Sequence, residues 1–124
     1  MLDPDVREII QQGYRTFLAS RELSPRLGQK QMIAAVANAV THEDPDKRIA
    51  VVEAGTGTGK TVGYLIAALP LARALKKTVV VATGTIALQE QLIHKDLPEL
   101  LAACGWDYRC ALVKGRGRYA CNLK

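Results

Sequence analysis

The chain has 124 residues, of which 48% are hydrophobic and 23% are charged, and its formal net charge is +5. This balance is typical of one soluble globular domain and excludes a disordered or collagen-like segment. No apolar run approaches the roughly 20 residues of a membrane-spanning helix, and the N-terminus opens with acidic residues, so neither a membrane protein nor a secreted one is expected.

Two amphipathic helices are predicted in the first part of the chain. Apolar side chains recur at helical spacing over residues 5–19. Ser24 followed by Pro25 offers a capping residue and a proline for the first position of a second helix, whose apolar face covers residues 32–40. A polar loop follows this second helix.

The middle of the chain has the pattern of a strand–helix–strand unit. Residues 49–52 are a continuous apolar run before a glycine-rich turn, as in a strand buried on both faces. A helix through residues 62–69, bent or ended near Pro70, leads to a second β-branched run at residues 78–81, and residues 109–113 are expected to form a third strand. The order of elements predicts an α/β fold, with a parallel sheet flanked by helices.

Helix boundaries are also predicted in the C-terminal third. Thr85 can cap a helix, Asp96 and Glu99 have the spacing of a capping box, and Gly105 is expected to end the helix that follows. From Arg109 onward the chain has five basic residues and no acidic one. Such a segment suits a polyanion such as nucleic acid, and a solvated tail fits it equally well.

The strongest functional signal is a glycine-rich segment between the first predicted strand and a helix: Ala54, Gly55, Thr56, Gly57, Thr58, Gly59, Lys60 and Thr61. Alternate glycines let successive backbone N–H groups approach oxygen atoms and form a concave anion site. Lys60 would neutralise the β- and γ-phosphates of a nucleotide, and Thr61 would place its hydroxyl on Mg²⁺. The pattern predicts a phosphate loop but leaves kinases, transporters, GTPases and helicases open.

Four segments, in order along the chain, resemble motifs of superfamily-two helicases. They are residues 26–32 (similar to the Q motif), 52–61 (motif I), 83–92 with 95–98 (motif Ia of the iron–sulfur branch) and 113–121 (the approach to the first cluster cysteine). Motif I usually begins with alanine, as here at Ala54. From Ser24 onward the chain is therefore similar to the DinG/YoaA group of bacterial XPD-like DNA helicases.

The resemblance implies roles for individual residues. Arg26 and Gln29 would recognise the adenine side of ATP, whereas the helical pattern alone favours a surface position for Gln29. Thr83, Thr85 and Gln89 would contact the sugar–phosphate backbone of single-stranded DNA. An ordinary helix cap is a second reading of Thr85, and both can hold.

The resemblance also implies a [4Fe–4S] cluster, with Cys121 as the first of four thiolate ligands. Cys104 and Cys110 do not fall at the ligand positions of the family. We expect Cys104 to be a small hydrophobic residue at a helix end and Cys110 to be part of a strand.

The implied function is an ATP-dependent DNA helicase of 5′-to-3′ polarity that uses ATP and Mg²⁺ on single-stranded DNA in repair or replication, in the bacterial cytoplasm at the nucleoid. Residues 1–23 would be a helical lead-in, 24–113 a partial RecA-like ATP-binding domain, and 114–124 the start of the cluster segment. The sequence has no acidic Mg²⁺ motif and no second domain, so we expect an N-terminal fragment that is inactive alone.

The alternative is a stand-alone nucleotide- or nucleic-acid-binding module without turnover. A third possibility, an unrelated phosphate-loop kinase or transporter ATPase, leaves residues 26–32 and 114–121 unexplained.

Overall fold

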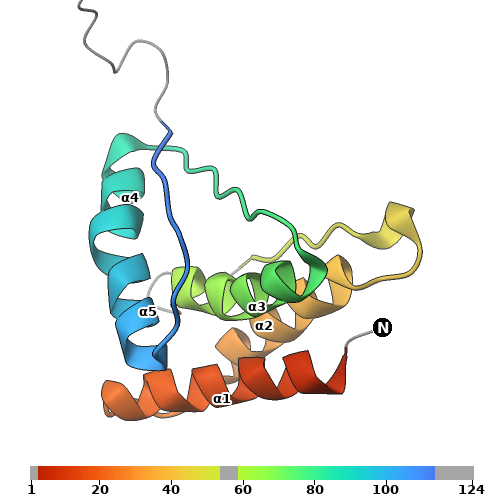
Figure 1. Cartoon of the computed structure of the whole chain (residues 1–124), viewed down its shortest axis with the longest axis horizontal. Helices are drawn as coiled ribbons and strands as arrows, with labels where there is room; N and C mark the ends of the chain where they lie inside the picture. Colours follow the sequence, from red (N-terminus) through yellow and green to blue (C-terminus); the bar gives the residue numbers. More distant parts are fainter. Residues whose placement is uncertain (1–2, 54–58, 114–124) are drawn as a thin grey trace, which may run out of the picture.

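The computed structural model describes residues 3–53 and 59–113, and within them the chain is built from helices joined by extended segments (Figure 1). The elements are α1 (Pro4–Ser20), α2 (Leu27–Val40), the 3₁₀ turn η1 (Pro45–Lys47), α3 (Lys60–Leu75), α4 (Ile86–Gln91), the π-helical stretch η2 (Leu92–Asp96) and α5 (Leu97–Cys104). None of the described helices is long and apolar enough to cross a membrane.

Helix α1 confirms the first predicted helix, and α2 begins later than predicted. The carboxylate of Asp3 caps α1 by accepting the N–H of Asp5 at 2.9 Å, with Pro4 in the first turn. The segment before α2 stays extended through Arg26, whose backbone N–H donates to the Tyr14 hydroxyl at 3.2 Å. Because this contact with α1 fixes Arg26 outside the helix, α2 begins at Leu27 and not at Ser24 and Pro25.

The core is formed where α3 packs against α1 and α2 and where α5 packs against α1. Ile66 of α3 and Leu100 of α5 are fully buried. Helices α2 and α3 approach closely at Gly63, where an added Cβ would lie 2.9 Å from the Met32 sulfur. The other buried apolar residues of the core are Val6, Ile10, Tyr14, Phe17, Leu18, Ile33, Ala37, Leu65, Ala67, Leu69 and Leu71.

Elements α4, η2 and α5 follow one another as a continuous helical rod at one side of the molecule (Figure 1). Thr85 caps the rod, since its Oγ1 accepts the N–H of Leu88 at 3.1 Å, and Gly105 ends it with φ +67°; both boundaries were predicted. The capping box at Asp96 was wrong, because Asp96 is itself helical and its side chain caps nothing. Pro98 in the first turn of α5 has no N–H to donate, and a proline ring crowds the carbonyl four residues earlier, which favours the wider π-helical geometry there.

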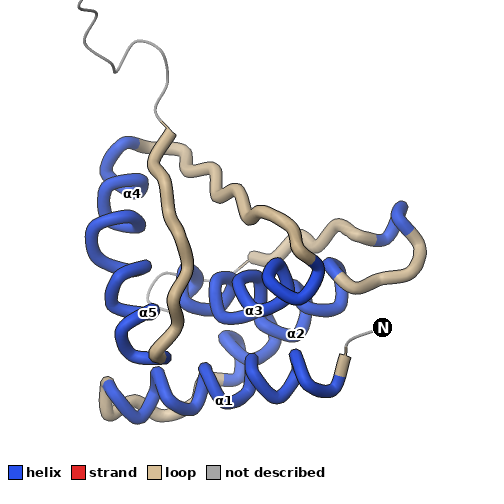
Figure 2. Tube along the Cα trace, in the orientation of Figure 1, coloured by secondary structure: helices blue, strands red, loops and turns tan. Residues whose placement is uncertain are grey.

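The predicted parallel sheet was wrong. No strand occurs in the part of the chain that the structure describes, and the three segments expected to be strands are loops in Figure 2. Val51 is 94% exposed and Val80 is 86% exposed, so neither lies in a buried strand. An apolar, β-branched run favours extended backbone, but a strand also needs a partner for its N–H and C=O groups, and the local sequence does not contain that partner.

The extended segments are held by side chains of the helices instead. Val79 and Val81 pack against the core while Val80 points outward. The segment after α5 is fixed to α3 by Arg73, whose guanidinium lies 3.9 Å from the centre of the Tyr108 ring. Helix α3 continues through Pro70 to Leu75, so it does not end at this proline.

Candidate nucleotide-binding site

A groove of about 210 Å³ opens where the end of α1, the start of α2 and the start of α3 meet. It is lined by Phe17, Leu18, Leu23, Ser24, Arg26, Gln29, Gly59 and Val62. Three of the residues predicted to bind ATP, namely Arg26, Gln29 and Gly59, therefore share one cavity. The groove combines an apolar wall with a few polar groups, as small-molecule sites commonly do.

Gln29 connects the two predicted nucleotide-binding segments. Its side chain is only 7% exposed, and its Nε2 donates to the carbonyl oxygen of Gly59 at 3.1 Å. The same oxygen accepts the N–H of Gly63 at 3.0 Å, the first hydrogen bond of α3. The surface position that helical periodicity favours for Gln29 was therefore wrong, and the side chain instead fixes the end of the glycine-rich segment.

A glycine is required at position 59 by the backbone conformation there and by the side chain packed against it. Its φ of +70° and ψ of +44° lie in the left-handed region, which glycine enters without steric cost. A Cβ at this position would lie 2.4 Å from Nε2 of Gln29. Residues 54–58, which include Ala54, Gly55, Thr56, Gly57 and Thr58, lie outside the described residues.

Lys60 and Thr61 form the first turn of α3, next to the groove. Lys60 is exposed and Thr61 is half-buried, so the ammonium group is accessible to a solute. The N-terminus of this 16-residue helix has N–H groups without helical partners and the positive end of the helix dipole. The arrangement suits an anionic group that carries a divalent cation.

The residues predicted to contact DNA lie elsewhere, at the α4 end of the rod, which Figure 1 shows at the far end from α1. The Thr83 hydroxyl donates to the carbonyl oxygen of Thr85 at 3.3 Å, and Thr85 caps α4. Gln89 donates from Nε2 to the carbonyl oxygen of Val113 at 3.0 Å. The cap reading of Thr85 is confirmed, and the three side chains are gathered at one end of the rod.

The cysteines of the described residues do not form a cluster site. Cys104 donates from Sγ to the carbonyl oxygen of Gly13 at 3.4 Å, and burial raises the pKa of its thiol to about 11. Cys110 is exposed in an extended segment, so its predicted place in a strand was wrong. No group of three or more potential metal ligands occurs within residues 3–53 and 59–113, and Cys121 lies outside them.

Sequence reasoning missed the apolar side of the groove. Phe17 and Leu18 come from α1, and Leu23 comes from the turn after it, in the part of the chain that adds little to the helicase resemblance. Phe17 and Leu18 fit the apolar stripe of an amphipathic helix, and the stripe does not distinguish a groove wall from a core residue. Their position in the sequence, a few residues before Ser24 and Arg26, was the only feature that could have indicated a place in the groove.

Comparisons with known proteins agree with the motifs. Residues 22–116 match the family described as "Type III restriction enzyme, res subunit". The chain is 38% identical over 126 residues to the "ATP-dependent DNA helicase DinG" of Photobacterium profundum, a match that covers 100% of this chain and 18% of that protein. It is 47% identical over 97 residues to DinG of Salmonella typhimurium and 46% identical over 97 residues to DinG of Escherichia coli, matches that cover 78% of this chain and 13% of each relative. The chain thus spans less than a fifth of the length of these curated relatives.

Proposed function

The chain belongs to the family of the type III restriction enzyme res subunit, and from this we propose that it is the nucleotide-binding part of an ATP-dependent DNA helicase similar to DinG. The proposal extends to Mg²⁺ as the metal, single-stranded DNA as the track and 5′-to-3′ as the direction. It places the protein in the bacterial cytoplasm at the nucleoid, in DNA repair or replication.

The observation that carries the proposal is the hydrogen bond between Gln29 and Gly59, two residues 30 positions apart. It joins the segment proposed to recognise adenine to the segment proposed to hold the phosphates. A plain glycine-rich turn does not require a buried amide from another helix. A nucleotide has a base at one end and phosphates at the other, and these two segments provide a surface for each.

Each residue of the site has a chemical task in this proposal. Lys60 neutralises negative charge on the phosphates, and the hydroxyl of Thr61 is a ligand for Mg²⁺. Bound Mg²⁺ supplies positive charge that stabilises the transferring phosphoryl group. Arg26 and Gln29 face the base, while the apolar wall with Phe17 and Leu23 removes the base from water. The nucleotide-binding unit is thus residues 24–113 together with the end of α1.

The DNA contacts are proposed at Thr83, Thr85 and Gln89, where hydroxyl and amide groups can donate to phosphate oxygens. A [4Fe–4S] cluster with Cys121 as one ligand also belongs to the proposal. The described thiols of Cys104 and Cys110 are bonded to backbone carbonyl oxygens and do not fit as its further ligands. The remaining ligands would come from outside residues 3–53 and 59–113.

The decisive experiment compares Lys60→Ala with the wild type in the full-length protein, by measuring ATP hydrolysis with and without single-stranded DNA. We expect the DNA-stimulated rate to fall at least about 100-fold, because the phosphates lose their main cationic partner. Lys47→Ala is the matched control, since Lys47 is an exposed lysine in η1 away from the groove. Unchanged turnover in Lys60→Ala would contradict the site, and ATP binding without turnover in the wild type would favour the stand-alone binding module.

A further inference from the structure

The turn that ends α1 shapes the groove and is fixed by backbone hydrogen bonds. The N–H of Leu23 donates to the carbonyl oxygen of Leu18 at 2.9 Å, and the N–H of Glu22 donates to that of Ala19 at 3.3 Å. Glu22 has φ +54°, a conformation that costs a non-glycine residue about 1 kcal/mol or more. The turn directs Leu23 into the groove beside Phe17, so its conformation defines the apolar wall.

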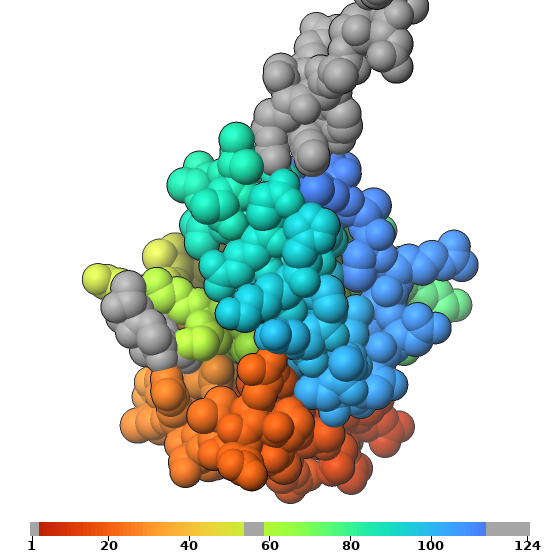
Figure 3. All heavy atoms as spheres, turned by 90° about the vertical axis from the view of Figure 1, so that its left-hand side faces the viewer, coloured from red at the N-terminus to blue at the C-terminus, as the bar shows by residue number. Residues whose placement is uncertain are grey.

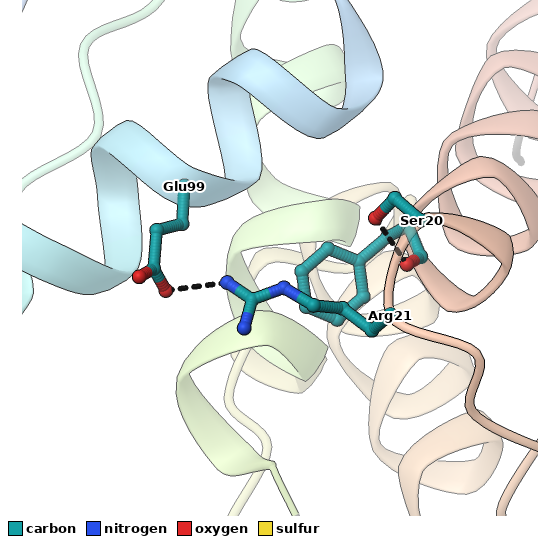
Figure 4. A network of polar contacts seen from close by, with 4 residues as sticks. Ser20, Arg21 and Glu99 are labelled. Atoms are coloured by element: carbon teal, nitrogen blue, oxygen red, sulfur yellow. Dashed lines mark hydrogen bonds and ion pairs between the residues drawn. The ribbon is translucent and has the colours of Figure 1, made fainter.

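Arg21 is the residue that connects this wall to another helix. Its guanidinium carbon lies 5.7 Å from the centre of the Phe17 ring, within the range of a cation–π contact. Its Nη2 lies 2.5 Å from Oε2 of Glu99 on α5, a residue 78 positions away (Figure 4). Arg21 therefore contacts both the aromatic side of the groove and the helical rod.

Helix α5 is the lower end of the rod whose upper end carries the proposed DNA contacts. In Figure 3 the rod stands directly on the C-terminal half of α1, as it also does in Figure 1. A second contact between α1 and the rod end lies deeper: Cys104 is bonded to the Gly13 carbonyl oxygen, and Gly13 is covered by the Trp106 ring. The ion pair of Arg21 is the exposed contact of the two, with both side chains 41% exposed.

We propose that Arg21 is a positioning residue that couples occupancy of the nucleotide groove to the placement of the rod formed by α4, η2 and α5. A base that enters the groove contacts Phe17 and Leu23, and because Phe17 lies against the Arg21 guanidinium, occupancy of the groove changes how firmly Arg21 is held at Glu99. Because thermodynamic coupling is reciprocal, DNA bound at the α4 end changes nucleotide affinity through the same contact. This inference rests on the proposed function, since it requires both ligands.

The expected size of the coupling is small, because exposed ion pairs contribute little and are screened by salt. We expect single-stranded DNA to change the dissociation constant of the nucleotide, with roughly two- to five-fold of that change passing through Arg21. We also expect this share to shrink as salt is raised.

The test measures binding of a fluorescent ATP analogue to the full-length protein, with and without saturating oligothymidylate. Arg21→Ala and Glu99→Gln should each reduce the DNA effect on nucleotide affinity by the same factor. The double exchange Arg21→Glu with Glu99→Arg restores the ion pair but leaves no cation at position 21 over the Phe17 ring, so it should not restore the DNA effect, whereas a merely structural ion pair would be rescued by it. Arg15→Ala is the control, because Arg15 is exposed on α1, the helix that Arg21 follows, and its side chain is bonded to Gln12.

The outcomes separate this inference from the proposed function. If the wild type does not bind the ATP analogue, the proposed function fails. If the wild type binds it and DNA has no effect on its affinity, or if both single variants keep the full effect, the role of Arg21 is overturned and the nucleotide site stands. Loss in both single variants that persists in the exchange supports the coupling, and recovery in the exchange overturns it.

Discussion

Gln29 and Gly59 are fitted to each other in both directions: the amide of Gln29 donates to the carbonyl oxygen of Gly59 at 3.1 Å, and any Cβ on Gly59 would lie 2.4 Å from the same nitrogen. The side chain of one residue therefore occupies the space that the other leaves empty. The position of the proposed phosphate loop relative to α2 depends on this fit.

Substitution of Gly59 by Ala should weaken both the fold and nucleotide binding. The left-handed φ of +70° costs an alanine about 1–2 kcal/mol, and the new methyl group must displace the amide of Gln29. We expect a loss of about 1–3 kcal/mol in the free energy of unfolding and at least tenfold weaker ATP binding. Urea denaturation and titration calorimetry measure the two effects.

Gly28→Ala is the control for this substitution. A Cβ on Gly28 would meet nothing within 4 Å, and the residue lies in the first turn of α2. Stability should be unchanged or higher by up to about 1 kcal/mol, since alanine favours helix over glycine. Equal losses in both variants would mean that the Gln29 contact is not the cause.

Gln29→Glu should destabilise the site by replacing the donor with an acceptor. A carboxylate oxygen facing the Gly59 carbonyl repels it, and this carbonyl keeps only the N–H of Gly63 as a donor, so we expect a cost of about 1–3 kcal/mol. Gln31→Glu on the exposed face of the same helix should have no such effect. Thermal unfolding of both variants, followed by circular dichroism, tests this. A Gln29→Glu variant as stable as the control would show that the contact with Gly59 does not contribute to stability.

Gly13→Ala should disturb the junction between α1 and the end of α5. A Cβ there would lie 2.4 Å from Cζ2 of Trp106, so the indole must move despite the better helix propensity of alanine. We expect a net loss of about 1–3 kcal/mol in unfolding free energy. Trp106 is the only tryptophan, so its fluorescence should shift to longer wavelength as the ring becomes exposed, and an unchanged spectrum would argue against the close contact.

Cys104 should make stability depend on alkaline pH. Burial raises the pKa of its thiol from the ordinary 9.0 to about 11 in the folded state. The folded state therefore holds this proton more tightly than the unfolded state, so the contribution to stability is complete below pH 9 and is lost as the pH rises toward 11. Between pH 9 and 11 the unfolding free energy, measured by denaturation at each pH, should fall less steeply with pH in Cys104→Ala than in the wild type. Peptide mapping should show slower alkylation at Cys104 than at exposed Cys110.

A pair of valine substitutions tests the correction to the fold. Val80 is 86% exposed, so Val80→Ser should change the unfolding free energy by less than about 0.5 kcal/mol. Val81 packs against the core, and Val81→Ser should cost about 1–2 kcal/mol. A large loss at Val80 would show that this residue is buried after all.

The helices and several of their ends could be predicted because their causes are local. The Thr85 cap and the Gly105 stop depend on side chains and backbone within one turn of the helix. The absence of a sheet from the described residues could not be predicted. The sequence around Val51 and Val80 indicates extended backbone, but it does not show whether another segment is available to pair with it. The later start of α2 escaped prediction for a similar reason: it depends on Tyr14, 12 residues earlier.

Only the part of the candidate site that carries a sequence motif was predicted. The sequence indicated Gln29 and Gly59 as functional, but the contact between them crosses 30 residues and appears only in the fold. Phe17 and Leu23 carry no motif, and only their place beside the groove distinguishes them. Ala54 to Thr58, Cys121 and the DNA contacts remain predictions.

The π-helical stretch η2 determines the direction in which the far end of the rod faces. A π-helical turn holds about one residue more than an α-helical turn, and one residue corresponds to a rotation of about 100° around the helix axis. Removing one residue between Leu92 and Asp96 would leave α5 seated on the core through Leu100 while turning Thr85 and Gln89 toward a different side. The direction in which Thr85 and Gln89 face around the helix axis is therefore set by the length of a five-residue segment that contains neither of them.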